Sequence, residues 1–233
     1  MRLDKFLADT TDLTRSLATK AVKSGRVLVN GSKPRSASLK ITTEDQVTLD
    51  GETLTLEAGF RYFVMNKPAG YVCTHRDSTH PLVFDLLEGV VNRMALHTVG
   101  RLDRETTGLL LITDDGHFSH HLTSPRHHQP KTYRAWLAEP LRDDAEQKFE
   151  QGILLEDDPE RTRPAQLQRI SPQEVLLTIH EGRYHQVRRM FAALGNHVDK
   201  LHRERMGAMT LPEELAEGEF RPLSEAEIGR LTG

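Results

Sequence analysis

Two kinds of apolar spacing alternate along the chain and together predict a mixed α+β protein. Apolar residues three and four positions apart predict helices, here at residues 3–8, 14–25 and 184–194. Short apolar or alternating runs predict strands, here at residues 26–29, 61–65, 109–112, 131–137 and 175–179. The segment 51–60, GETLTLEAGF, lies between two differently patterned regions, and we interpret it as the connection between two domains. We therefore expect a small domain over residues 1–58 and a larger domain over residues 59–233.

Local helix and turn signals define the small N-terminal domain. Thr14 is a suitable N-cap for the second helix, because a threonine hydroxyl accepts a hydrogen bond from the first free backbone amides. Leu17, Ala21 and Val22 give this helix one apolar face. Gly25 is a suitable terminator, and an Asn-Gly turn follows the next strand. These signals predict two short helices followed by a strand and a tight turn.

Positive charge is concentrated in this domain, although the whole chain has a net charge of -3. Residues 13–43 contain no acidic side chain and seven basic ones: Arg15, Lys20, Lys23, Arg26, Lys33, Arg35 and Lys40. Six glutamates between residues 212 and 228 offset this charge. A basic region of this kind is either an ordinary solvated surface or a binding surface for a polyanion such as RNA.

A charged loop precedes the apolar strand at residues 109–112. Asp103 lies on this loop, with Arg101, Arg104 and Glu105 beside it. A loop anchored to a buried strand fixes a reactive side chain and leaves it accessible. The same residues also fit a solvated loop without a chemical role, or a hydrolase that uses Asp103 and Glu105 as paired carboxylates.

Two further segments combine core packing with polar residues. In the strand at residues 131–137, alternation places Tyr133, Ala135 and Leu137 on one face. The helix at residues 184–194 has an apolar stripe at helical spacing, formed by Val187, Met190, Phe191 and Leu194. Gly195 follows as the C-terminal stop. The arginines of this helix and of the turn before it lie outside the stripe.

Four sequence strings together resemble a known family. Residues 2–51, RLDKFLADTTDLTRSLATKAVKSGRVLVNGSKPRSASLKITTEDQVTLDG, are similar to an S4-type RNA-binding domain. GRLDRETTGLLLITDDG at 100–116, KTY at 131–133 and VLLTIHEGRYHQVRRMFAALG at 175–195 resemble the three motifs of RNA pseudouridine synthases of the RsuA and RluA kind. NKPAG at 66–70 resembles the turn that opens their catalytic domain. The resemblance implies a small S4-like domain and a mixed, largely antiparallel β-sheet flanked by helices.

The resemblance also implies roles for three side chains. Asp103 corresponds to the nucleophile that attacks a uridine extruded from the RNA, and Tyr133 to the tyrosine that stacks on the base and takes part in proton transfer. Arg188 corresponds to the basic residue that pairs with the aspartate. An arginine within about 4–6 Å favours the ionised carboxyl group. The base leaves through N1 and rejoins through C5 without redox change, so we expect no cofactor.

Ribosomal RNA is the partner that the resemblance implies. We expect contacts from the basic N-terminal residues Arg15, Lys20, Lys23, Arg26, Lys33 and Arg35, and from Lys67, Arg101, Arg126, Arg183 and Arg189 of the larger domain. The compact arrangement most resembles members that modify one uridine of 16S ribosomal RNA, either naked or in a partly assembled small-subunit particle. Members that act on 23S ribosomal RNA share the three motifs, and a non-catalytic assembly factor would keep the same fold.

Histidines, the single cysteine and the apolar runs bear on other function classes. Histidines near the middle of the chain could in principle bind zinc: His117, His120, His121, His127 and His128. No carboxylate or cysteine completes a ligand pattern there, so we expect no metal site. Cys73 is the only cysteine, which excludes an internal disulfide. No apolar run is long enough to span a bilayer. We expect a cytoplasmic monomer that does not bind membranes.

Overall fold

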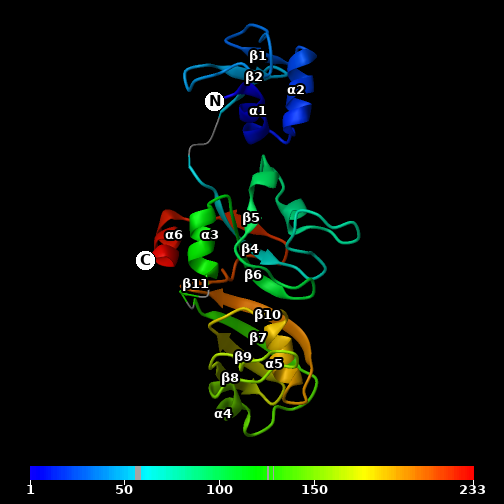
Figure 1. Ribbon diagram of the computed structural model, residues 1–233, viewed down its shortest axis with the longest axis vertical. Coiled ribbons are helices and arrows are strands. Elements are labelled where there is room, and N and C mark those ends of the chain that lie inside the picture. The colour runs from blue at the N-terminus through cyan, green and yellow to red at the C-terminus, as the bar shows by residue number, and fades with distance from the viewer. Residues whose placement is uncertain (56–58, 125, 128) are drawn as a thin grey trace. The chain divides into compact units, whose positions relative to one another are not determined.

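The chain folds into two compact units (Figure 1). The computed structural model describes residues 1–55, 59–124, 126–127 and 129–233. The first unit contains Met1–Phe60 and Leu87–Leu96, and the second contains Arg61–Leu86 and His97–Gly233. The domain boundary expected at residue 58 lies outside the described residues.

The first unit combines two helices with a small antiparallel sheet. Helix α1 spans Leu3–Thr10 and helix α2 spans Arg15–Lys23. The strands follow the order β1-β2-β3, with the bounds Val27–Val29, Val47–Leu49 and Glu52–Leu54. The segment 51–60, which we interpret from the sequence as the connection between the domains, therefore contributes β3 to the first unit. Its backbone pairs with β2 and completes the sheet.

Helix α2 begins and ends where its sequence predicts. The Thr14 hydroxyl accepts a hydrogen bond from the amide of Leu17 at 3.3 Å, and Gly25 follows the helix with a φ of +78°. The buried face consists of Ala18, Ala21 and Val22. Leu17, which we expected on this face, is 45% exposed. Positions three and four residues apart share a helix face, so Ala18, and not Leu17, lies centrally beside the other two.

The second unit is built on a large mixed sheet. Its described strands follow the order β12-β4-β6-β10-β7-β9-β8, with β5 beside β6 and β11 beside β10. The bounds are Tyr62–Lys67 (β4), His97–Thr98 (β5), Thr107–Thr113 (β6), Lys131–Leu137 (β7), Gln166–Ser171 (β8), Glu174–Ile179 (β9), Val198–Met206 (β10), Met209–Thr210 (β11) and Phe220–Pro222 (β12). Strands β6 and β10 are parallel, whereas the other described pairs are antiparallel. The expected mixed, largely antiparallel sheet is confirmed.

Short helices flank this sheet. They span Gly116–Thr123 (α3), Ala145–Glu150 (α4), Gln186–Ala192 (α5) and Glu225–Thr232 (α6), and a 3-10 turn lies at Val83–Leu86. The 3-10 turn at Arg93–Ala95 belongs to the first unit. Helix α3 contacts α6, α4 contacts β8, and α5 contacts β10 (Figure 1). None of the helices in the described part of the chain is long and apolar enough to cross a membrane.

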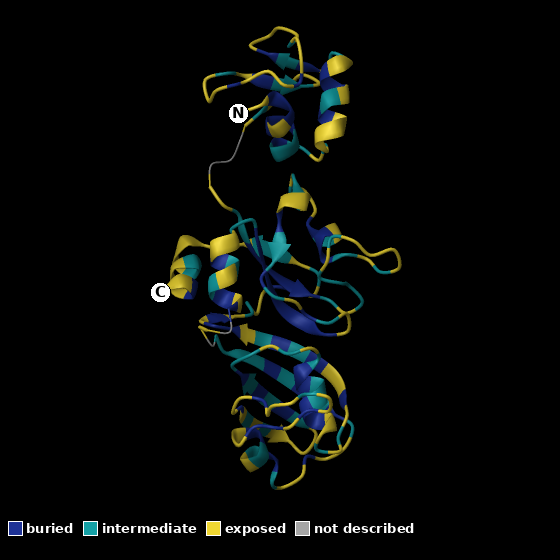
Figure 2. Ribbon diagram, in the orientation of Figure 1, coloured by how far each residue is buried: buried dark blue, intermediate teal, exposed yellow. Residues whose placement is uncertain are grey.

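The central strands are the most buried part of the second unit (Figure 2). Every residue of β6 is buried, and β4 is buried from Phe63 to Lys67. Leu109 and Leu111 pack in one apolar cluster with Val64 and Phe118. Full burial of a leucine side chain contributes about 1.5–3 kcal/mol. The buried strand expected at residues 109–112 is confirmed, and the loop that precedes it is attached to a rigid element.

Candidate active site

Asp103 lies on the loop that leads into β6. The amide of Thr106 donates to the carbonyl oxygen of Asp103 at 3.0 Å, which closes a tight turn. At Gly108 the φ angle is +103°, and a Cβ atom would lie 2.3 Å from the carbonyl oxygen of Arg203 on β10. Only glycine therefore allows β6 and β10 to approach this closely. This approach fixes the end of the Asp103 loop.

A buried lysine holds the same loop. Lys67, the last residue of β4, has no exposed surface. Its Nζ donates to the carbonyl oxygens of Pro68, Arg104 and Thr106 at 2.9, 3.0 and 2.9 Å. Burial lowers the pKa of Lys67, while the charge of the nearby Asp103 acts in the opposite direction. The expected RNA contact of Lys67 is therefore wrong, because all three ammonium donors are used inside the protein.

Asp103 faces a cavity of about 1030 Å³. Its walls come from the Asp103 loop, from β7 and β10, and from the turn before α5. Tyr133 on β7 lines the cavity and is 8% exposed. Tyr133, Ala135 and Leu137 are buried on one face of β7, as their alternation predicts. A cavity of this size can enclose a ligand as large as a nucleotide.

The imidazole of His185 lies beside the carboxylate of Asp103 in this structure. Its Nε2 lies 3.4 Å from Oδ1 of Asp103. His185 has a left-handed φ of 47° and precedes α5 as its N-cap residue. Its ring stacks on the ring of Tyr184, with centroids 3.8 Å apart, and Tyr184 itself is 72% exposed. We did not predict this contact, because neither residue type nor spacing indicates a left-handed histidine.

The expected ion pair between Arg188 and Asp103 is wrong for this structure. Arg188 lies on α5, and its Nη1 donates to the carbonyl oxygen of Val198 at 2.6 Å. The helix begins at Gln186, two residues later than we expected, because His185 leaves the helical conformation. This break brings His185, and not Arg188, to the carboxylate. The apolar stripe is confirmed for Val187, Met190 and Phe191, which are buried, whereas Leu194 follows the helix and is only partly buried.

Arg183 and Arg189 hold a loop together and do not present free charge to RNA. Arg183 pairs with Asp158 and Glu181 at 3.2 Å, and it also donates to the carbonyl oxygens of Glu160 and Arg161. Arg189 pairs with Asp158 at 3.3 Å. The phosphate contacts that we expect of both arginines stay a prediction, and in this structure both guanidinium groups pair with carboxylates. These ion pairs and hydrogen bonds connect residues 156–163 to the start of α5.

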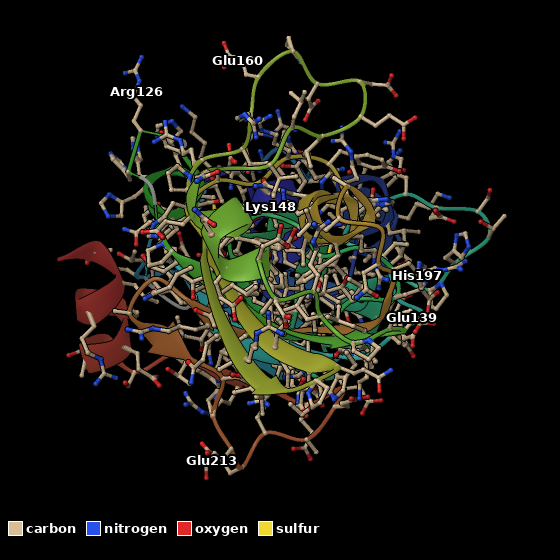
Figure 3. The ribbon with its side chains drawn as sticks, turned by 90° about the horizontal axis from the view of Figure 1, so that it is seen from below. Arg126, Glu139, Lys148, Glu160, His197 and Glu213 are labelled. Atoms are coloured by element: carbon tan, nitrogen blue, oxygen red, sulfur yellow. The ribbon has the colours of Figure 1, made fainter. Side chains whose placement is uncertain are left out.

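The remaining basic candidates of the second unit are accessible. Arg101 is exposed and lines the cavity beside Asp103. Arg126 is also exposed and extends away from the ribbon (Figure 3), but it does not line the cavity. The neighbouring residues 125 and 128 lie outside the described residues. Arg101 is thus placed to contact a ligand in the cavity, and Arg126 to contact only a larger molecule.

The basic residues of the first unit form a second accessible region. All seven are exposed: Arg15, Lys20, Lys23, Arg26, Lys33, Arg35 and Lys40. Arg15 pairs with Asp4, and Arg26 pairs with Asp50. Lys23, Lys33 and Arg35 surround a depression of about 510 Å³. Exposed cations around a concave surface are suited to phosphate contacts.

Two other chemical interpretations lack support from the geometry. Glu105 does not line the cavity, and its carboxylate pairs with Arg104 at 2.6 Å, so it does not converge with Asp103 as a hydrolytic carboxylate pair would. The rings of His121 and His127 lie 4.6 Å apart. Within the described part of the chain, no group of three or more histidine, cysteine or acidic residues could hold a metal ion.

Comparisons with known proteins agree with this architecture. Residues 61–193 match the model for RNA pseudouridylate synthase, and residues 1–47 match the S4 domain. The chain is 50% identical over 228 residues to ribosomal small subunit pseudouridine synthase A of Escherichia coli (strain K12), covering 98% of each chain. It is 52% identical over 231 residues to the protein of that name from Vibrio cholerae, covering 99% of each.

A solved structure extends the likeness to the fold. A crystal structure described as pseudouridylate synthase is 46% identical, covers 99% of both chains and superposes with a TM-score of 0.71. The resemblance inferred from the sequence strings and the fold class that it implies are both confirmed. The chain therefore belongs to the RNA pseudouridylate synthase family and carries an N-terminal S4 domain.

Proposed function

We propose that this protein converts one specific uridine of the 16S ribosomal RNA to pseudouridine, with Asp103 as the nucleophile. The observation that carries the role of Asp103 is its position on a braced loop at a cavity that Tyr133 and Arg101 also line. A carboxylate in this position can attack a nucleotide whose base has been extruded from the RNA, either at ribose C1′ or at the uracil ring. The reaction is an isomerisation, so the product has the same composition as the substrate.

The neighbouring side chains support this chemistry. Tyr133 presents an aromatic ring to the cavity, and stacking on an extruded base contributes on the order of 1–3 kcal/mol. His185 orients the carboxylate through the 3.4 Å contact with Asp103. Extrusion of a base costs a few kcal/mol. Contacts of Arg101 and of the S4 domain with the RNA offset this cost.

The choice of 16S ribosomal RNA is supported by the names of the relatives. Proteins 50–52% identical to this chain over 98–99% of its length are small-subunit pseudouridine synthases. The S4 domain supplies the exposed basic surface for a ribosomal RNA or a partly assembled small-subunit particle. We further propose that the protein acts as a monomer in the cytoplasm, and sedimentation of the protein alone would test its oligomeric state.

Pseudouridine mapping tests the proposal directly. Wild-type protein and Asp103→Asn are each incubated with 16S and 23S ribosomal RNA, both naked and in partly assembled particles. The wild type is expected to make one new small-subunit pseudouridine. Asp103→Asn is expected to lose at least about 10³-fold in rate, because the amide is a poor nucleophile, while RNA affinity is retained.

Other outcomes would change the assignment. A site in 23S ribosomal RNA would replace the proposed substrate. Equal activity of Asp103→Asn and wild type would remove Asp103 from the reaction. RNA binding without modification of any substrate would indicate an assembly factor.

A further inference from the structure

Arg203 is the largest fully buried side chain among the described residues, and the proposed roles above do not use it. It lies on β10 between β6 and β7 and is 1% exposed. Its Nε donates to the carbonyl oxygen of Leu109 at 2.8 Å. Its Nη2 is buried and has no hydrogen-bond partner among the described residues. A buried guanidinium group with an unused donor is costly, so its retention calls for an explanation.

The charge of Arg203 is also uncompensated. None of the ion pairs between described residues includes Arg203 or its neighbour Lys131. Lys131 lies on β7, is largely withdrawn from solvent, and donates from Nζ to the carbonyl oxygen of Gln129 at 3.0 Å. Burial, aided by the charge of Arg203, lowers the pKa of Lys131 to about 8. Two like charges therefore share a poorly solvated region.

Both cations belong to the wall of the Asp103 cavity. Arg203 is paired with Tyr133 across β10 and β7, and paired residues present their side chains on the same face of a sheet. Lys131 is two positions from Tyr133 on β7, so it shares that face. All three side chains line the cavity with Asp103. The wall that carries the stacking tyrosine is thus positively charged.

We propose that Arg203, assisted by Lys131, stabilises the negative charge that the uracil base acquires during the reaction. This inference rests on the proposed pseudouridine chemistry. When Asp103 attacks ribose C1′, a C1′–O bond forms and the N1–C1′ bond breaks. The electron pair of the broken bond remains on the base and spreads from N1 to O2 and O4. The detached base is then an anion beside two cations that have no other counterion.

The remaining steps return the negative charge from the base to the carboxylate of Asp103. C5 of the base attacks C1′, and the bond between C1′ and the Asp103 oxygen breaks with its electron pair on the carboxylate. The proton on C5 is lost and a proton is gained at N1, so the product is an isomer of the substrate. Attack by Asp103 on the uracil ring would also place negative charge on the base oxygens. Fixed cations that have already lost much of their hydration stabilise such charge with little reorganisation.

The dependence of the reaction rate on the stability of the departing base distinguishes charge stabilisation by Arg203 and Lys131 from a purely structural role. Arg203→Gln and Lys131→Met are compared with wild type in single turnovers on RNA that carries either uridine or 5-fluorouridine at the target. Fluorine withdraws electrons and stabilises the uracil anion, so cleavage of 5-fluorouridine requires less help from the protein. Since fluorine also replaces the C5 proton, the readout is disappearance of the target nucleoside, which follows N1–C1′ cleavage in both RNAs.

The expected result is a difference between the two RNAs. Arg203→Gln should slow uridine conversion about 10²–10³-fold, the size of effect seen when a charge-stabilising donor is removed, and slow 5-fluorouridine conversion much less. Lys131→Met should also slow uridine conversion more than 5-fluorouridine conversion, but by a smaller factor. It leaves the hydrogen bond from Arg203 to Leu109 intact, so it tests the inference even if Arg203→Gln does not fold. Arg205→Gln is the matched control, because Arg205 is exposed on the same strand and donates to the carbonyl oxygen of Gly207.

Two results would overturn the inference. If Arg203→Gln and Lys131→Met slow both RNAs by equal factors, or slow neither, the cations do not stabilise the departing base. If wild-type protein converts neither RNA, the proposed function itself fails and the inference falls with it. Conversion of uridine by wild type therefore distinguishes the two kinds of failure.

Discussion

Positive charge occupies two contrasting environments in this protein. In the S4 domain the basic side chains, such as Lys20, Lys23 and Arg35, are exposed. In the catalytic unit Lys67 and Arg203 are almost completely buried. Exposed cations keep their hydration until they bind RNA, and this binding releases the counterions condensed on the RNA. Buried cations have already lost that hydration, so they interact strongly with whatever charge or carbonyl oxygen lies beside them.

The contrast separates binding from chemistry. The exposed cations can move, and no single one has to be placed accurately to attract a polyanion. Lys67 instead holds three backbone carbonyl oxygens, two of them on the Asp103 loop. We therefore expect changes to exposed charge to alter affinity and its salt dependence, and changes to buried charge to alter the rate or the stability.

The largest effect is expected from Lys67→Met. The substitution removes three hydrogen bonds and leaves carbonyl oxygens unsatisfied beside the Asp103 loop. A displacement of about 1 Å at a reacting group can cost on the order of 10²-fold in rate, so kcat should fall by about this factor. Single-turnover kinetics at saturating RNA measure it. The control is Lys20→Met, an exposed lysine for which kcat should stay the same, and unchanged kcat in Lys67→Met would remove the distinction between the two environments.

A smaller effect, on affinity alone, is expected from the double substitution Lys20→Gln and Lys23→Gln. Each lost phosphate contact reduces the slope of log K against log salt by about one, so the slope should fall by about two while kcat at saturating RNA is unchanged. Filter binding over a salt series measures the slope. Lys148→Gln on α4 is the matched control (Figure 3), because Lys148 pairs with Asp144 outside the S4 domain. An equal change in the control would show a non-specific response to net charge.

A pH-dependent effect on stability is expected from Lys131. Its pKa is lowered from 10.5 to about 8 in the folded protein, mainly by burial. Between these two values the unfolded chain binds more protons, so the free energy of unfolding rises with pH. Relative to Lys131→Met, which cannot titrate there, wild type should gain stability from pH 8 to pH 10.5. Urea unfolding across this range measures the difference, and a difference independent of pH would contradict the burial of the ammonium group.

The smallest effect is expected from Thr14→Ala. Loss of the cap on α2 should lower the stability of the S4 domain by about 1 kcal/mol without changing any charge. RNA affinity well below the unfolding temperature should stay unchanged, because the exposed lysines remain in place. Thermal unfolding measures the stability. Thr19→Ala is the control, since Thr19 lies inside the same helix and its hydroxyl only donates back to the carbonyl oxygen of Arg15. Equal destabilisation by both substitutions would argue against capping.

Much of the architecture follows from local sequence. The cap at Thr14, the stop at Gly25, the buried strand at residues 109–112 and the alternation around Tyr133 each depend on neighbouring residues, so local patterns predict them. The motif around Asp103 was specific enough to indicate the family. The expected burial of Leu17 was wrong, and the third strand of the S4 domain was not predicted. Helix faces and strand pairing are decided by what packs against them.

The site itself needed the tertiary structure. A lysine in NKPAG has the same sequence signature whether it contacts RNA or holds a loop, and only the fold brings Lys67 to carbonyl oxygens 37 and 39 residues away. Likewise, only the left-handed backbone at His185 brings that ring to Asp103 in place of Arg188. The partners of a charged side chain lie far along the chain, and no local pattern encodes them.

The sequence by itself therefore determined the family, the fold class and the position of the candidate nucleophile. The tertiary structure decided which cations are exposed and which are buried, and hence that Lys67 and Arg203 serve the interior of the catalytic unit. The physical reason is that chemical identity is a property of single residues and their neighbours. The solvation of a charged side chain depends on the packing of the whole domain, and it decides whether that side chain binds RNA at the surface or interacts with groups inside the protein.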